Sequence, residues 1–153
     1  MPIEQAITVK GVGPVGAVSF NVDERGAMDG GNRFYTPYQH VNAPLLAGSL
    51  DGYVWICIEG VWQVAAVRAL VSTAGGSGAQ VDVKVCAGLT APASGTTQLS
   101  AALVLTTTGP SRADGTLIAT PTQIFPGDSI ALDFGGTLTA LVGVIAIQVK
   151  RVA

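Results

Sequence analysis

Val81-Asp82-Val83-Lys84-Val85 alternates apolar and polar side chains residue by residue, and this pattern decides the fold class. The same alternation recurs at residues 129–134 and again at residues 145–150. A period of two places successive side chains on opposite faces of a β-strand, one face buried and the other wet. No stretch carries a 3.6-residue apolar stripe bounded by helix caps. The sequence therefore predicts an all-β protein.

Short β-type runs, separated by Gly, Pro, Asp and Ser, continue from Ser49 to the end of the chain. Eight or nine strands in about a hundred residues is the strand density of a double-sheet jelly roll. We therefore expect residues 49–153 to form a jelly-roll-like antiparallel β-sandwich. The expected strands are residues 53–58, 62–73, 80–87, 98–106, 116–120, 122–125, 129–134, 137–141 and 143–152.

Local patterns add detail to this body. Both faces of the run at residues 53–58 are apolar, which predicts a central strand. The phase of the run at 62–73 slips around Ala65 and Ala66, which indicates a β-bulge. The core is expected to contain Ile130, Leu132, Phe134, Ile145, Ile147 and Val149.

A turn is expected at Pro126-Gly127, because Pro presets the first corner and Gly permits the positive φ of a type II turn. Asp128, directly after this turn, can accept backbone N–H bonds.

Residues 1–48 differ from the rest and predict an extended N-terminal arm, or an edge hairpin with a loop. Residues 3–10 and 17–22 are possible strands, and residues 23–32 are polar and glycine-rich. An aromatic cluster of Phe34, Tyr35 and Tyr38 follows. Exposed aromatics of this kind are an aggregation risk unless they pack on a neighbour. We therefore expect these three residues to be interface anchors.

Charge content limits the classes of partner. Charged residues make up 12% of the chain, about half the usual ~25%. This scarcity suggests that much of the surface meets other protein, although Ser, Thr, Gln and Asn can also solubilise a monomer. The net charge is −2, and Lys150-Arg151 is the only adjacent basic pair, which argues against nucleic-acid binding. No run of 18 apolar residues exists and the N-terminus has no signal-peptide pattern, so neither a membrane span nor secretion is expected.

Residues for chemistry are few, and we expect neither enzymatic activity nor a cofactor. The single histidine, His40, would have to serve any general-base site, and Cys57 lies between Ile56 and Ile58 in a setting where a thiol is inert. Without a secretory signal, Cys57 and Cys86 are expected to be free thiols in a reducing cytoplasm.

Other candidate sites are weak matches to their patterns. Residues 11–16 fit the letters of a dinucleotide fingerprint, but Pro14 lies inside them and a β-like segment follows where a helix is needed. Asp23, Glu24 and Asp29 surround a glycine loop but match no calcium-loop spacing. The remaining candidates are Asp51 and Glu59 as a glycosidase pair, and Trp55 and Trp62 as sugar-stacking residues.

The stretch Val83-Lys84-Val85-Cys86-Ala87-Gly88-Leu89-Thr90-Ala91-Pro92-Ala93-Ser94-Gly95-Thr96 resembles a pattern found in tailed-bacteriophage virion proteins, where a strand runs into Ala-Pro-Ala-Ser-Gly-Thr. The resemblance covers roughly residues 60–152 and identifies architecture rather than role, because its motifs are turns and strands. Ala87 stands where the pattern usually has Thr, and residues 1–48 are not covered. The resemblance continues through residues 99–102, 115–117, 126–132, 135–141 and 149–151.

Such proteins are similar to jelly-roll capsid decoration (cement) proteins and small fibre proteins. The resemblance implies a protein of the virion, on the outer capsid surface and made in the bacterial host cytoplasm. Its partners would be the major capsid protein and further copies of itself, as a dimer or trimer. The alternative is a tail or fibre domain that binds host-surface carbohydrate. Buried tryptophans would favour the first role, and a tryptophan exposed in a groove would favour the second.

Overall fold

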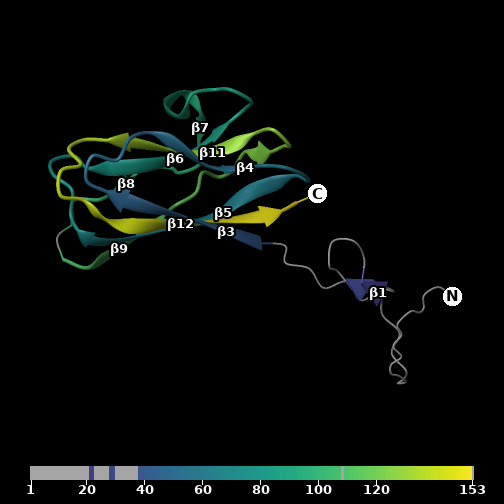
Figure 1. Cartoon of the computed structure of the whole chain (residues 1–153), viewed down its shortest axis with the longest axis horizontal. Coiled ribbons are helices and arrows are strands. Elements are labelled where there is room, and N and C mark those ends of the chain that lie inside the picture. Colours follow the sequence, from purple (N-terminus) through teal and green to yellow (C-terminus); the bar gives the residue numbers. More distant parts are fainter. Residues whose placement is uncertain (1–20, 23–27, 30–37, 108, 153) are drawn as a thin grey trace, which may run out of the picture. The chain divides into compact units, whose positions relative to one another are not determined.

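The structure, a computed structural model, describes residues 21–22, 28–29, 38–107 and 109–152. The chain divides into two units, residues 1–37 and residues 38–153. In the first unit, β1 (Asn21–Val22) pairs antiparallel with β2 (Met28–Asp29). The second unit, which we call the body, holds the other described strands (Figure 1).

Two five-stranded antiparallel sheets form the body. Both can be followed in Figure 1, where β12, β5, β3 and β9 form one layer and β11, β6, β4, β8 and β7 the other. Sheet I has the order β10 (Gln123–Ile124), β5 (Trp62–Thr73), β12 (Val142–Arg151), β3 (Tyr38–Leu46), with β9 (Ser111–Gly115) also paired to β5. Sheet II has the order β4 (Gly52–Ile56), β11 (Ser129–Gly135), β6 (Gln80–Cys86), β7 (Thr96–Thr97), with β8 (Leu103–Val104) also paired to β6.

Strand pairing is nested, as in a jelly roll. The first strand of the body, β3, pairs with the last, β12, and the next, β4, pairs with β11. Inside them β5 pairs with β9, and β6 pairs with β8. The chain thus folds back on itself as one long double strand that rolls into two sheets. The all-β, jelly-roll-like antiparallel sandwich predicted from the sequence is confirmed.

The core follows the alternation read from the sequence. Ile130, Ile145, Ile147 and Val149 are fully buried, and Leu132 is nearly so. Phe134, near the end of β11, is only partly buried, although it packs against the same cluster. The predicted core is therefore confirmed, except that Phe134 lies at its margin.

The body begins before Ser49, so the predicted boundary at residue 48 is corrected. Tyr38–Leu46 is a nine-residue strand that pairs with β12 along its whole length. Val41, Ala43 and Leu45 point into the core, and the boundary between the two units falls after residue 37. The rest of the expected arm, residues 1–37, lies outside the described residues apart from β1 and β2.

Strand β4 lies at the edge of sheet II rather than at its centre, because it pairs with β11 alone. Its register shifts between Ile130 and Ala131 of β11, which leaves Val54 without a partner in the pairing. As a result Tyr53 and Ile56 are both exposed, while Val54 and Trp55 pack against the core. Both faces of β4 are therefore apolar because one packs against the core and the other is exposed at the edge of the sheet, and not because the strand is central.

The predicted bulge in β5 is confirmed. Gln148 of β12 lies opposite Ala66, and the next residue, Val149, lies opposite Val64, so Ala65 is the extra residue. The turn at residues 125–128 is also found as expected. Gly127 has φ 96°, and the backbone N–H and a carboxylate oxygen of Asp128 both bond to Phe125.

Three predicted elements differ from the structure. Residues 98–106 contain only the short β8, and residues 137–141 form a turn with Ala140 at φ 67°. Residues 116–120 make one isolated bridge, between Leu99 and Leu117. By contrast, residues 111–115, which lie outside every strand expected from the sequence, form β9.

The outer faces of the two sheets are covered differently. The segment that carries η2 (Pro92–Ser94) packs on β6 and β11, on the outer face of sheet II. A Cβ on Gly95 would lie 2.9 Å from the Lys84 Cβ, so only glycine permits this close approach. Sheet I has no such cover among the described residues, and Leu46, Leu70 and Val142 are each about half exposed on it.

Candidate interaction surfaces

The structure does not bring His40 and Cys57 together. His40 is exposed on the outer face of sheet I, with its Nε2 atom 2.9 Å from the Nε2 atom of Gln148. Cys57 follows β4 of sheet II and is buried, with its Sγ atom 3.6 Å from the Glu59 carbonyl oxygen. Burial, reinforced by the charge of Asp128, raises the pKa of this thiol. The protonated form that results is a poor nucleophile.

The second cysteine is similar. Cys86 is fully buried and its pKa is raised by burial. Both cysteines are free thiols.

Asp51 and Glu59 lie at opposite ends of β4 and serve the fold. A carboxylate oxygen of Asp51 accepts the backbone N–H of Phe134 at 2.8 Å. The carbonyl oxygen of Glu59 accepts the indole N–H of Trp62 at 2.8 Å. No group of His, Cys, Asp and Glu within the described ranges is placed to hold a metal ion. Asp23, Glu24 and residues 11–16 lie outside those ranges, and Asp29 is part of β2.

Of the three predicted interface anchors, only Tyr38 is among the residues that the structure describes. Phe34 and Tyr35 lie outside the described residues. Tyr38 is the first residue of β3 and is 42% exposed. It therefore belongs to the body, at the point where the chain enters it.

The two tryptophans pack against each other. Trp62 is buried, and Trp55 meets it edge to face with 6.0 Å between ring centroids. The Arg151 guanidinium carbon lies 6.0 Å from the centroid of Trp62. Trp62 is thus a core residue, whereas the partly buried Trp55 also reaches a surface groove described below.

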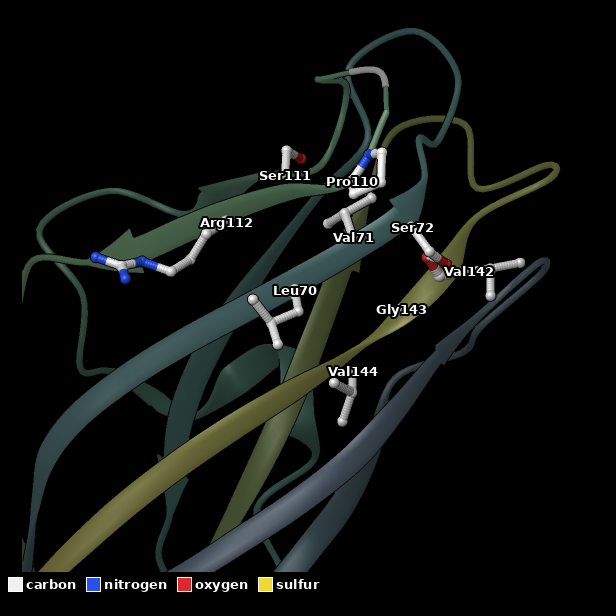
Figure 2. Close-up of a pocket in the computed structure, with 9 residues that line it drawn as sticks. All are labelled: Leu70, Val71, Ser72, Pro110, Ser111, Arg112, Val142, Gly143 and Val144. Carbon is white, nitrogen blue, oxygen red and sulfur yellow. Dashed lines mark hydrogen bonds between the residues drawn. The ribbon is translucent and has the colours of Figure 1, made fainter.

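A shallow groove of about 570 Å³ lies on the bare outer face of sheet I, at the end where β5 finishes and β12 begins. Figure 2 shows Leu70 and Val144 side by side on neighbouring strands, with Arg112 beyond Leu70 on β9. We call this surface the sheet I groove. It is lined by Leu70, Val71, Ser72, Pro110, Ser111, Arg112, Val142, Gly143 and Val144.

The rim of the sheet I groove carries more positive than negative charge. The Arg68 Nε atom lies 2.5 Å from one oxygen of Asp114, and an Arg112 amino nitrogen lies 2.6 Å from the other. The hydrogen bonds that Arg68 and Arg112 donate lower the pKa of Asp114, and the bond from Arg68 has the larger effect. Two guanidinium groups therefore share one carboxylate, and all three side chains are about half exposed.

A second groove of about 450 Å³ lies along edge strand β4. Tyr53, Trp55, Ile56 and Leu89 are among its lining residues. Leu89 is 100% exposed at the tip of a tight turn, in which the Thr90 N–H bonds to the Ala87 carbonyl oxygen at 3.1 Å. We call the surface formed by Tyr53, Ile56 and Leu89 the apolar tip.

Hydrogen bonds hold the apolar tip in place. The Tyr53 hydroxyl donates to the Thr90 carbonyl oxygen at 2.9 Å, which joins the turn to β4. The Gly88 N–H lies 3.4 Å from a carboxylate oxygen of Asp128. This end of the body carries charges of both signs, because Lys150 and Arg151 at the end of β12 lie at the same end as Asp128 and Glu59.

Sequence reasoning missed both surfaces, although a signal was present. In β5 and β12 the outward positions should be polar, yet Leu70, Val142 and Val144 occupy them. Apolar residues at the outward-facing positions of a strand predict that this surface is covered by another molecule or segment.

Comparisons with known proteins give only weak structural similarities. No protein-family profile and no curated protein matches the chain. Among solved structures, a protein of the disulfide-linked pili of Bacillus endospore appendages is similar, at 11% identity and a TM-score of 0.33 over 76% of this chain and 88% of that one. A protein of infectious bursal disease virus strain Gx is similar at 16% identity and a TM-score of 0.25, over 74% of this chain and 34% of that one. Within the described residues, no helix has the length and apolar character needed to cross a membrane.

Proposed function

We propose that the protein is a structural component of a phage virion, a decoration protein that binds the outer capsid and stabilises contacts between major capsid subunits. The observation that most supports this role is the apolar surface of the body. Large apolar side chains stand exposed around a complete core, led by Leu89 at 100%, Leu50 at 86% and Ile58 at 77%. Leu70, Val142 and Val144 lie together on the outer face of sheet I, and contiguous apolar surface of this kind marks protein interfaces.

In this proposal the residues before the body supply the capsid anchors. Tyr38 starts β3, so Phe34 and Tyr35 lie within four residues of the body, a reach of at most about 14 Å. Aromatic anchors can each contribute 2 kcal/mol or more to binding. Many modest contacts repeated over a capsid then add up through avidity.

The test is binding to undecorated capsids of the phage that encodes the protein. A Phe34→Ala/Tyr35→Ala variant should bind about 30-fold or more weakly for each anchor that carries 2 kcal/mol. Phe125→Ala is the matched control, because Phe125 is an aromatic residue 49% exposed on the body. Equal binding by both variants would show that the anchors lie elsewhere, and no binding by the wild type would end the proposal.

A tail or fibre domain that binds host-surface carbohydrate is the second candidate. Tyr53 and Trp55 support it, because both line the groove along β4 and aromatic faces suit sugar rings. Host glycans presented on an array provide the test. Binding that is lost in Tyr53→Ala but kept in Phe125→Ala would favour this role over decoration.

A further inference from the structure

The groove along β4 contains a buried hydroxyl group. Ser129 lines this groove and is only 6% exposed. Among the described residues, its Oγ atom is the one buried side-chain oxygen or nitrogen without a hydrogen-bond partner in the protein. A buried hydroxyl that makes no hydrogen bond costs free energy, so folded proteins rarely retain one without a reason. A ligand that bonds to it from the groove would supply that reason.

The strand register places the Ser129 side chain on the groove side of sheet II. Ser129 of β11 lies opposite Ile56 of β4. The next N–H along β4, that of Cys57, bonds to the Asp128 carbonyl oxygen at 2.9 Å. Ser129 and Ile56 are therefore a non-hydrogen-bonded pair, in which the two side chains lie close together on one face of the sheet. Ile56 is 56% exposed on that face and lines the same groove.

The walls of the groove are apolar, and no charged side chain lines it. Val54, Ile56 and Leu89 supply its aliphatic surface. The Tyr53 hydroxyl donates its proton to the Thr90 carbonyl oxygen, so the phenol oxygen can still accept a hydrogen bond. The groove therefore suits a neutral group with a small apolar part, one hydrogen-bond acceptor and one donor.

An acetamido group has this composition, because it joins an apolar methyl group to a carbonyl acceptor and an N–H donor. A plain hexose instead presents a hydroxyl at nearly every ring position. A hydroxyl that leaves water for an apolar wall without finding a new partner weakens binding. The half-exposed ring of Tyr53 offers an aromatic face to the C–H groups of a sugar ring.

We propose that the groove along β4 binds an N-acetylated sugar. The acetyl methyl group packs against Ile56 and Leu89, the acetyl carbonyl oxygen accepts the hydroxyl proton of Ser129, and the amide N–H donates to the Tyr53 oxygen. This inference rests on the second role proposed above, the binding of host-surface carbohydrate, and it names the chemical class of the sugar.

The test compares two sugars that differ only at the second ring carbon, methyl N-acetyl-α-glucosaminide and methyl α-glucoside. Each is titrated into the full-length protein, and binding is followed by saturation-transfer NMR. The N-acetylated sugar should bind about tenfold or more tightly, and its acetyl methyl protons should receive the most saturation. The corresponding galactose pair is measured as well, so that ring stereochemistry does not decide the result.

Ser129→Ala tests the role of the buried hydroxyl. It should weaken binding of the N-acetylated sugar by about tenfold, the effect of losing one hydrogen bond. It should unfold no earlier than wild type, because the group that it removes has no partner within the protein. Ser77→Ala is the matched control, since Ser77 is exposed in another turn and lies outside the groove. Its affinity should equal that of wild type.

Equal affinity for both sugars of each pair, or no binding of either N-acetylated sugar, would overturn the proposal. Unchanged affinity in Ser129→Ala would also overturn it, and would mean that the hydroxyl bonds only to water. The second role itself fails separately, on the glycan array. Array binding by glycans without an acetamido group, lost in Tyr53→Ala, would keep that role and remove this inference.

Discussion

Gln98 binds Thr122 through both ends of its amide: its Oε1 atom accepts the Thr122 backbone N–H at 2.8 Å, and its Nε2 atom donates to the Thr122 hydroxyl at 3.1 Å. Gln98 follows β7 of sheet II, and Thr122 precedes β10 of sheet I. The backbone continues the link, because the Ile118 N–H bonds to the Gln98 carbonyl oxygen at 3.0 Å. A buried amide therefore joins the two sheets along one side of the sandwich.

Gln98→Leu should lower the free energy of unfolding. The substitution leaves the Thr122 N–H without its acceptor, and an unsatisfied buried group costs about 1–3 kcal/mol. Urea unfolding followed by tryptophan fluorescence measures the change. Gln123→Leu, at an exposed position of β10, is the control and should unfold at nearly the wild-type midpoint. Coincident midpoints for all three proteins would show that the amide link adds nothing.

Ile147→Ala should cost more than Phe134→Ala, despite the larger phenyl ring. Ile147 is fully buried in β12, where truncation to Ala typically costs about 2–5 kcal/mol. Phe134 is only partly buried, so its loss should fall below the ~3–5 kcal/mol typical of a buried Phe. Chemical denaturation of both variants gives the order directly, and the reverse order would place Phe134 at the centre of the core.

The thiols of Cys57 and Cys86 should resist alkylation in the folded protein. Burial raises the pKa of both thiols, which keeps them protonated, and it also shields them from reagents in solution. Iodoacetamide at neutral pH, read by mass spectrometry, should label neither residue until denaturant is added. Rapid labelling of either one under native conditions would mean that its site opens or ionises.

Lys84 should stabilise the body at neutral pH and lose this effect in strong alkali. Burial alone lowers the pKa of its amine, but the hydrogen bond to Asp133 and the charge of Asp82 outweigh burial and raise it above 10.5. A raised folded pKa gives stability that is complete below the unfolded value and is lost as pH rises through the folded one. The difference in unfolding free energy between wild type and Lys84→Met should therefore shrink above pH 10.5.

Lys150→Met, on the other sheet, controls for general loss of positive charge. A difference for Lys84→Met that stays constant through that alkaline range would show that the ion cluster with Asp82 and Asp133 contributes nothing.

The sequence predicts those features of the fold that depend on residues close together in the chain, and it does not predict those that depend on which strands pair. The bulge at Ala65 could be foreseen because it shifts the phase of a single run. The residues of β3 fall within the predicted arm, because the aromatic cluster around Pro37 is too broken to indicate a regular element. Pro44 is tolerated there because β3 is an edge strand, where one row of N–H groups needs no partner. Whether a strand lies at the edge or at the centre depends on the pairing of the whole sheet, and no local sequence pattern reveals it.

The candidate surfaces were harder to predict than the core. Leu70 and Leu89 are ordinary leucines in the sequence, and only the three-dimensional arrangement shows that one lines a hollow and the other projects into solvent. The charges beside the groove come from β5 and β9, which are brought together by the pairing of Arg68 with Asp114. The sequence does show the shortage of charge, which indicates that part of the surface is covered.

Tyr38 lies opposite Lys150, so the chain enters the body on β3 and the last strand, β12, ends beside that point, at the same end of the body. A pulling force applied between these two points would act across the hydrogen bonds of β3 and β12 one after another, like a zipper, instead of loading them all at once in shear. The nine residues of β3 would then separate from β12 one pair at a time, beginning at Tyr38.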